Sequence, residues 1–358
     1  MIRERLISAF LERNGYPPTD AKPLAQDASF RRYLRLSRGS RPAVLMDAPP
    51  PEDIGPFIRI AAHLAHVGAS VPEIFAADEA EGLLLEEDLG DDLISAFIDD
   101  DPAASLSPEA GEACPRALDP GGRGRGATSH LAPLFDAAVD TLVAIQRATP
   151  PPGLPPWDAR AMAATALSTL CDWWWPAMFG AGPPAAARQE FAAALETTLA
   201  PVAAGPICFV HRDFFAGNLI WLPNRSGIRR IGILDFQSAA IGHPAYDLAS
   251  LLQDNRRDIP PDLAEHTIAR YLAARPELDP ETFRAAYAAC AAQRHLRIAG
   301  QWVRLARRDD RPGYLRYGPR TWRLLEQAVR QPAAAPLATA LDRWIPPNCR
   351  CNPPDLAA

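Results

Sequence analysis

The residues with the clearest chemical meaning lie in two segments, His211-Arg212-Asp213-Phe214-Phe215-Ala216-Gly217-Asn218 and Ile233-Leu234-Asp235-Phe236. A carboxylate such as Asp213 can orient an incoming hydroxyl group and accept its proton. The amide oxygen of Asn218 and the carboxylate of Asp235 suit Mg²⁺, which prefers oxygen ligands. This combination is typical of phosphoryl transfer, which depends on positioning and charge neutralisation more than on covalent chemistry.

Short apolar runs must position these groups. Three of them are predicted to be buried strands: residues 207–210, 219–222 and 228–234. Asp213 and Asn218 therefore share one loop, and Asp235 ends the strand that follows. We expect His211 to brace this loop by hydrogen bonding. The alternative is a polar turn whose Asp and Asn cap local backbone groups.

The two segments resemble the catalytic loop and the metal-binding segment of the aminoglycoside phosphotransferase and choline kinase superfamily, relatives of the protein kinases. Ala245-Tyr246-Asp247-Leu248-Ala249 is similar to the signature that follows in that superfamily, where the Asp usually ties down the catalytic loop. The resemblance implies that ATP and Mg²⁺ are used. It implies Asp213 as the base and Asn218 and Asp235 as the metal ligands.

Four further motifs resemble the anomeric N-acetylmuramate/N-acetylglucosamine kinases of bacterial cell-wall recycling. They are Asp27-Ala28-Ser29-Phe30-Arg31-Arg32-Tyr33, Val44-Leu45-Met46-Asp47-Ala48-Pro49-Pro50, Gln293-Arg294-His295-Leu296 and Pro312-Gly313-Tyr314-Leu315. This narrower resemblance covers most of the chain, outside a middle insertion and the extreme C-terminus. It implies that either amino sugar is phosphorylated on its anomeric hydroxyl, giving the sugar 1-phosphate for peptidoglycan recycling.

The fold that the resemblance implies is α+β, two-lobed and protein-kinase-like. We expect a small N-terminal nucleotide-binding lobe with an antiparallel sheet and the hinge in residues 1–90. A larger, mainly helical catalytic and substrate lobe is expected in residues 91–345, with MgATP between the lobes and a tail in residues 346–358. Residues 99–130 are rich in Asp, Pro, Gly, Ser and Ala, which predicts a mobile insertion.

Apolar periodicity and turn residues predict the individual elements. Strands are expected at residues 22–26, 32–37, 42–48, 73–78 and 83–87, and helices at 1–15, 53–68, 131–147 and 280–308. The strand at 83–87 resembles the hinge of the superfamily. There adenine would bond to backbone groups of Glu87 and Leu89.

A phosphate-binding position differs from the superfamily pattern. Many members hold the α- and β-phosphates with a strand lysine paired with a helix glutamate. Lys22 is the only lysine of this chain, and Met46 stands near the expected position. The expected substitutes are Arg31 or Arg32, beside Ser29, whose hydroxyl can donate to phosphate. Successive side chains of a strand point to opposite faces of the sheet, so only one of the two arginines can face the nucleotide. The sequence does not show which of the two it is.

Candidate substrate contacts lie on two helical segments. Three consecutive tryptophans cannot all face one core on an α-helix, so Trp173 or Trp175 is a candidate for stacking on a sugar ring, with core packing as the alternative. One polar, basic stripe at i+3/i+4 spacing is formed by Arg294, Arg297, Gln301, Arg304 and Arg308, and Arg294, Arg297 and Arg304 are the candidate contacts. A solvated face is the alternative. An arginine of this stripe can bind the lactyl carboxylate of N-acetylmuramate bidentately.

Composition argues against several other classes of protein. The 358 residues carry a net charge of −6, which disfavours a nucleic-acid partner. The apolar runs are too short to cross a membrane, and residues 1–15 do not read as a signal peptide. The six cysteines are scattered, which favours a reduced, cytoplasmic protein. The sequence indicates a small-molecule substrate and no obligate protein partner.

Two alternatives to the amino-sugar kinase remain open. Another small-molecule kinase of the superfamily, acting on an aminoglycoside, an amino alcohol or homoserine, would share the same base and metal ligands. A pseudokinase that binds a nucleotide without catalysis is the second alternative. The missing phosphate-binding lysine supports it, and the intact set of Asp213, Asn218 and Asp235 argues against it.

Overall fold

The structure is a computed structural model that describes residues 2–24, 31–37, 41–99 and 130–356. The chain forms two compact units. Unit 1 consists of Met1–Asp92 and Ile220–Ser238, and unit 2 of Leu93–Leu219 and Ala239–Ala358. Most of the expected insertion, together with residues 25–30 and Ser29 among them, lies outside the described residues.

Unit 1 is built on an antiparallel sheet with the strand order β1-β2-β3-β5-β4. The strands are β1 (Ala21–Pro23), β2 (Arg32–Leu36), β3 (Ala43–Asp47), β4 (Ile74–Asp78) and β5 (Leu83–Glu87). The expected strands are confirmed, and their bounds agree within a few residues. In the register, Met46 of β3 lies between Tyr33 of β2 and Leu84 of β5.

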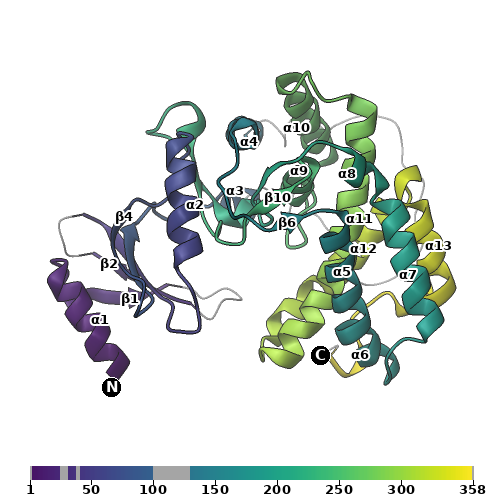
Figure 1. Cartoon of the computed structure of the whole chain (residues 1–358), viewed down its shortest axis with the longest axis horizontal. Helices are drawn as coiled ribbons and strands as arrows, with labels where there is room; N and C mark the ends of the chain where they lie inside the picture. Colours follow the sequence, from purple (N-terminus) through teal and green to yellow (C-terminus); the bar gives the residue numbers. More distant parts are fainter. Residues whose placement is uncertain (1, 25–30, 38–40, 100–129, 357–358) are drawn as a thin grey trace. The chain divides into compact units, whose positions relative to one another are not determined.

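The two faces of this sheet carry different helices (Figure 1). Helix α1 (Ile2–Arg13) packs its Phe10 and Leu11 against Leu36 and Leu45 on one face. Helix α2 (Gly55–His66) lies on the other side of the sheet. Because alternate strand residues point to opposite faces, Leu34 and Leu36 share the α1 face, whereas Tyr33 and Arg35 point away from it.

A two-stranded hairpin of β8 (Leu219–Trp221) and β9 (Ile231–Ile233) accompanies this sheet. The sequence predicted that the second strand begins at residue 228, which is wrong, because Gly227–Arg230 forms a 3₁₀ turn before the strand. Ser70 fixes the hairpin: its Oγ donates to the carbonyl of Arg229 at 2.8 Å. Its own carbonyl accepts the N–H of Ile233 at 2.8 Å.

Unit 2 is mainly helical. Its helices are α3 (Ile94–Asp99), α4 (Ala132–Arg147), α5 (Ala159–Thr169), α6 (Trp175–Phe179), α7 (Ala185–Thr198), α8 (Ala200–Ala204), α9 (Ala245–Leu252), α10 (Pro261–Ala274), α11 (Pro280–Arg308), α12 (Gly318–Ala328) and α13 (Ala335–Trp344). A small sheet joins β6 (Pro156–Trp157), β10 (Ala240–Gly242) and β7 (Cys208–Val210). None of the helices in the described ranges is long and apolar enough to cross a membrane.

Helix α11 runs through the centre of unit 2, and the two helices expected at residues 131–147 and 280–308 are confirmed by α4 and α11. Gly300 permits the close contact between α11 and α5, because a Cβ atom there would lie 2.2 Å from the carbonyl oxygen of Thr169. Gln293 adds a buried hydrogen bond to the carbonyl of Met162 at 2.7 Å.

The tryptophan run does not follow a regular α-helix. Leu170–Trp174 forms a π-helical turn, which has more residues per turn than an α-helix and so narrows the angular step between successive residues. Two of the three indoles are consequently buried: Trp174 packs on Trp322 at 4.9 Å and Trp175 on Phe191 at 6.3 Å between ring centroids. The indole N–H of Trp174 also donates to the carbonyl of Cys351 at 3.0 Å, which attaches the expected tail to unit 2.

Candidate active site

The loop after β7 is held by one buried carboxylate. Asp247, in the first turn of α9, has no solvent exposure and accepts the backbone N–H groups of His211 at 2.7 Å and Arg212 at 2.9 Å. Burial raises the pKa of Asp247 to about 7, although the two N–H groups oppose that shift. The carboxylate therefore fixes the backbone immediately before Asp213, as the superfamily resemblance implied.

Within this loop, Asp213 and Asn218 are linked directly. The side-chain Nδ2 of Asn218 donates to the backbone carbonyl of Asp213 at 3.0 Å. This contact uses the amide nitrogen of Asn218 and leaves its Oδ1 atom as an acceptor-only oxygen, the type of ligand that Mg²⁺ takes. The buried His211 accepts the N–H of Asp213 on its Nδ1 atom at 3.3 Å. His211 thus braces the loop, and the partly exposed Asp213 side chain is accessible to a ligand.

Arg212 was not singled out from the sequence. Its φ of 75° lies in the left-handed region, which a residue with a Cβ atom rarely adopts and which is common at functional sites. The guanidinium carbon of Arg212 lies 3.9 Å from the centre of the Trp157 ring, a cation–π contact that fixes the position of the side chain. Nothing in the sequence except its place between His211 and Asp213 indicated this conformation.

In unit 1, Asp235 also adopts a left-handed conformation, with a φ of 58°. Its Oδ1 accepts Nε2 of Gln237 at 2.6 Å, and the neighbouring Phe236 packs on Phe57 of α2 at 4.5 Å. Burial raises the pKa of Tyr33, and the charges of Glu86 and Asp235 raise it further. Asp235 therefore lies near the sheet face that carries Tyr33, opposite the α1 face.

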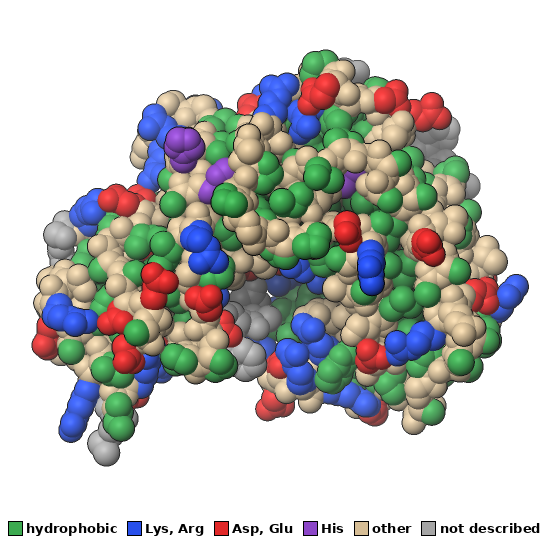
Figure 2. All heavy atoms as spheres, viewed as in Figure 1, with side chains coloured by type: hydrophobic (Ala, Val, Ile, Leu, Met, Phe, Trp, Pro, Cys, Tyr) green, Lys and Arg blue, Asp and Glu red, His purple; other side chains and the backbone are tan. Residues whose placement is uncertain are grey.

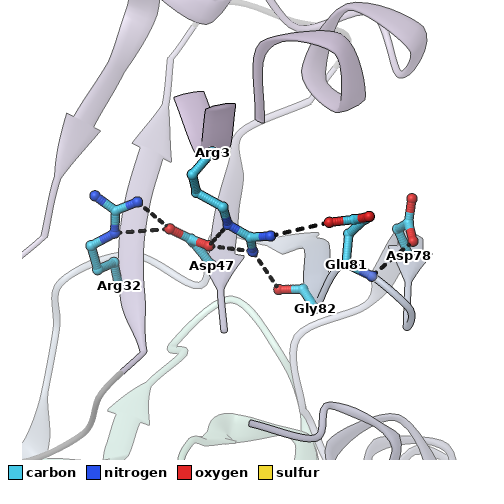
Figure 3. Close-up of polar contacts among 6 residues, drawn as sticks. All are labelled: Arg3, Arg32, Asp47, Asp78, Glu81 and Gly82. Carbon is cyan, nitrogen blue, oxygen red and sulfur yellow. Dashed lines mark hydrogen bonds and ion pairs between the residues drawn. The ribbon is translucent and has the colours of Figure 1, made fainter. Parts of the chain in front are cut away.

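Arg31 and Arg32 point to different faces of that sheet. Arg32 donates its Nε to Asp47 at 2.8 Å, and Asp47 is fully buried beside α1, where Arg3 also donates to it at 2.8 Å (Figure 3). Arg31 is buried on the other face, where it bonds Tyr33 and donates to Glu52 and to the carbonyl of Asp53, each at 3.3 Å. Arg31 is thus the arginine on the face near Asp235.

The same face holds a buried acid, Glu86 of β5. Burial raises its pKa to about 8, and the positive charge of Arg31 opposes that shift. The folded-state pKa of Glu86 lies above the unfolded value of 4.5. The contribution of Glu86 to the free energy of unfolding is therefore complete below pH 4.5 and is lost as the pH rises through the folded-state pKa of about 8.

We therefore expect the unfolding free energy of the wild type, relative to Glu86→Gln, to fall by on the order of a few kcal/mol between pH 5 and pH 8. Urea denaturation of both proteins at the two pH values measures this difference. Glu73→Gln, at an exposed acid just before β4, is the control and should keep the wild-type pH dependence. Equal pH dependence of the wild type and Glu86→Gln would contradict the expectation.

The expected hinge follows Glu86 directly. The N–H of Glu87 donates to the carbonyl of Glu73 at 2.8 Å, and its side chain pairs with Arg225 at 2.7 Å. A nucleotide base could therefore use the Glu87 carbonyl but not its N–H. The side chain of Leu89 lies close to Gly232, where an added Cβ atom would meet Leu89 Cδ1 at 3.0 Å.

The basic stripe of α11 is only partly a solvated face. Figure 2 shows basic side chains, all of them arginines, gathered on unit 2 around the C-terminal half of this helix. Arg308 is exposed and pairs with Asp309 at 2.7 Å, as the solvated-face interpretation expected. That interpretation is wrong for Arg294, which is 4% exposed and donates to Asn255 at 3.3 Å. Arg297 is half-buried, with Nη2 3.5 Å from the Tyr246 hydroxyl.

Of the two candidate tryptophans, Trp175 is packed in the core and Trp173 is the half-exposed indole. An aromatic contact that the sequence did not suggest lies elsewhere in unit 2. The guanidinium of Arg256 lies 4.8 Å from the ring of Phe215, in the catalytic loop, and 5.7 Å from the ring of Tyr314. Arg256 therefore connects the loop to one of the four motifs that carry the narrower resemblance.

No group of three His, Cys, Asp or Glu side chains in the described parts of the chain could hold a metal ion by itself. The predicted magnesium ligands are one amide and one carboxylate, so they would not form such a group. Their number fits Mg²⁺, which is usually bound through one or two protein oxygens together with substrate phosphates.

Comparison with known proteins identifies relatives along nearly the whole chain. A sequence model of the "Phosphotransferase enzyme family" matches residues 20–284. A protein of Caulobacter vibrioides named "N-acetylmuramate/N-acetylglucosamine kinase" is 37% identical, covering 97% of this chain and 98% of its own length. A protein of the same name from Pseudomonas aeruginosa is 33% identical, covering 91% and 88%.

Solved structures share the fold at low identity. A choline kinase from Streptococcus pneumoniae has a TM-score of 0.60 at 13% identity and covers 94% of this chain and 99% of its own. A choline/ethanolamine kinase family protein from Mesorhizobium loti has a TM-score of 0.57 at 15% identity, covering 90% and 92%. These likenesses confirm the predicted α+β, kinase-like fold.

Proposed function

This chain belongs to the phosphotransferase enzyme family, and we propose from that premise that it transfers the γ-phosphoryl group of ATP to an amino sugar. The relatives that match it over most of its length are named for N-acetylmuramate and N-acetylglucosamine, and we assign these two acceptors to this chain. One observation carries the reaction: Asp247 holds the loop so that Asp213 is fixed and accessible.

The acceptor atom in this proposal is the anomeric hydroxyl oxygen. It forms a bond to the γ-phosphorus, the bond from that phosphorus to the β–γ bridging oxygen breaks, and ADP leaves. Asp213 orients the hydroxyl and takes its proton. An anomeric hydroxyl is more acidic than an ordinary alcohol, which lowers the demand on this base. The product is the sugar 1-phosphate, which a cytoplasmic peptidoglycan recycling route can use.

The oxygen ligands for Mg²⁺ in this proposal are Asn218 Oδ1 and the Asp235 carboxylate. Local geometry supports each of them, since the Asn218 amide nitrogen is engaged by Asp213 and Asp235 is held by Gln237. The bound ion would neutralise charge on the β- and γ-phosphates.

Nucleotide binding is assigned to the lobe of residues 1–90, with the Glu87 carbonyl and Leu89 at the adenine and Ser29 and Arg31 at the phosphates. Residues 91–345 form the catalytic and substrate lobe in this assignment, followed by the tail of residues 346–358. The boundaries of the two compact units differ from those of this assignment, because residues 220–238, which include Asp235, belong to unit 1.

Arg31→Met is expected to raise the Kd for ATP by about 10- to 100-fold, because a charge-assisted hydrogen bond contributes about 1.5–3 kcal/mol. Arg32→Met removes the same charge one residue away, but its guanidinium is bonded to Asp47 on the α1 face. It should lower thermal stability and change the Kd for ATP little. Isothermal titration of both variants with ATP measures the difference. A larger loss of affinity in Arg32→Met would reverse the assignment.

The function is tested by incubating the protein with MgATP and, separately, N-acetylmuramate, N-acetylglucosamine or kanamycin, and recording phosphorus NMR spectra. A new signal coupled to the anomeric proton of either amino sugar would support the proposal. Phosphorylation of kanamycin alone would keep the base and metal ligands and refute the acceptor. ATP binding without turnover on any acceptor would favour the pseudokinase.

A further inference from the structure

Three arginines on α11 have a buried nitrogen without a hydrogen-bond partner among the described residues. These nitrogens are the Nε atoms of Arg294, Arg297 and Arg304. A buried donor without an acceptor destabilises the fold, and more strongly when the group is charged. Such atoms are rare in native structures and call for a bound ion, water or ligand.

The three arginines have different surroundings. Arg294 is enclosed and donates to Asn255, which also bonds His295 at 3.0 Å, so Arg294 belongs to a buried polar cluster. Arg297 and Arg304 are only half-buried. They are seven residues apart, which places them on the same side of the helix about two turns from each other. These two guanidiniums can therefore meet a ligand that arrives from solvent.

Positive charge is concentrated around Arg297. Burial lowers the pKa of Arg304, and the charges of Arg308 and Arg297 lower it further. Burial also lowers the pKa of Arg294 and of Arg212, and in both cases Arg297 contributes in the same direction. An anion bound between these guanidinium groups would reduce the electrostatic repulsion among them.

The base of the proposed reaction is close to this charge. Burial lowers the pKa of Arg297, whereas the charges of Tyr246 and Asp213 raise it, and the net shift is upward. The Nη2 atom of Arg297 lies 3.5 Å from the hydroxyl of Tyr246, the residue before Asp247, which holds the loop of Asp213. In the proposed reaction Asp213 contacts the acceptor hydroxyl, which puts Arg297 on the side of the helix where an anionic substituent of the acceptor would lie. The charge of Asp213 raises the pKa of Arg294 and of Arg297. Arg304 lies farther along the helix, and the charges that shift its pKa are those of Arg308, Asp309 and Arg297.

We propose that Arg297 and Arg304 form a carboxylate subsite that binds the lactyl group of N-acetylmuramate and sets the preference for this sugar over N-acetylglucosamine. The two sugars differ only in the lactyl ether on O3, whose carboxylate supplies the acceptor oxygens that the two Nε–H groups lack. Guanidinium groups bind carboxylates through parallel hydrogen bonds, which gives direction as well as charge. The inference rests on the proposed amino-sugar kinase function.

The test compares Arg297→Met, Arg304→Met and the control Arg308→Met. Methionine keeps much of the apolar stem and removes the charge. Arg308 is on the same helix but is exposed and paired with Asp309. The value of kcat/KM is measured by ADP release for N-acetylmuramate, N-acetylglucosamine and the methyl ester of N-acetylmuramate, which keeps the bulk and lacks the charge.

The ratio of kcat/KM for N-acetylmuramate to that for N-acetylglucosamine is expected to fall at least about tenfold in Arg304→Met and in Arg297→Met, the value of one charge-assisted hydrogen bond. Arg308→Met should keep the wild-type ratio. The wild type should discriminate against the methyl ester, and both subsite variants should lose that discrimination. Melting temperatures confirm that each variant is folded.

Equal losses on both sugars would overturn the inference, because they would show that the arginines act on the reaction or the fold rather than on the carboxylate. Unchanged ratios would also overturn it. In either case the wild type would still phosphorylate the sugars, so the proposed function would stand. A wild type that phosphorylates neither sugar would instead refute the proposed function, and the inference with it.

Discussion

Asp213→Asn is expected to lower kcat by about 10²- to 10⁴-fold, the range that a general base contributes, with little change in nucleotide affinity. The amide cannot accept the hydroxyl proton, yet it is nearly isosteric. The contacts that hold the loop use the backbone of Asp213 and not its carboxylate, so the loop should keep its shape. ADP release measures kcat, and calorimetric titration measures ATP binding.

Asp262→Asn is the matched control, since it makes the same chemical change at an exposed position in the first turn of α10. It should leave both quantities at wild-type values. Turnover within tenfold of the wild type in Asp213→Asn would refute the role of Asp213 as the base. Loss of ATP binding together with turnover would point to unfolding of the loop instead.

Asp247→Ala should have the second large effect, on stability and activity together. The change leaves the N–H groups of His211 and Arg212 buried without their acceptor, at a cost of about 1–3 kcal/mol each. Loss of the buried carboxylate, whose pKa burial raises, offsets part of this cost. We expect the unfolding free energy to fall by about 2–4 kcal/mol in urea denaturation, and kcat of the folded protein to fall as well.

Leu341→Ala separates the two effects. This core residue of α13 is buried, and its truncation should cost about 2–5 kcal/mol without touching the catalytic loop. At a temperature where both variants are folded, Leu341→Ala should keep the wild-type kcat. If Asp247→Ala kept it too, Asp247 would contribute only stability.

The loop of residues 211–218 that carries the proposed base could be predicted because its determinants are local. His211, Asp213 and Asn218 lie within eight residues of one another, between two apolar runs whose length and flanking turn residues predict buried strands. Asp235 follows the next strand in the same way. The motif Gln293-Arg294-His295-Leu296 was visible too, but its role was not, because its partners Met162, Gln253 and Asn255 lie far away in the sequence.

Features that depend on tertiary packing could not be predicted. Alternation showed that Arg31 and Arg32 face opposite sides of the sheet, but only the position of α1 decides which side each one takes. The left-handed φ of Arg212 has no signal in residue type, and that of Asp235 has only the general enrichment of Asp in this region. The π-helical turn that buries both Trp174 and Trp175 replaces the 100° step on which the prediction depended.

The link between Arg3, Arg32 and Asp47 also has an evolutionary consequence. One buried carboxylate serves two guanidiniums, so the three positions do not have equal freedom to change. Loss of either arginine leaves Asp47 with a partner, whereas loss of Asp47 leaves two cations beside an apolar face. Among relatives, we expect either arginine to be substituted while the other remains, and Asp47 to be substituted only where both arginines are already replaced.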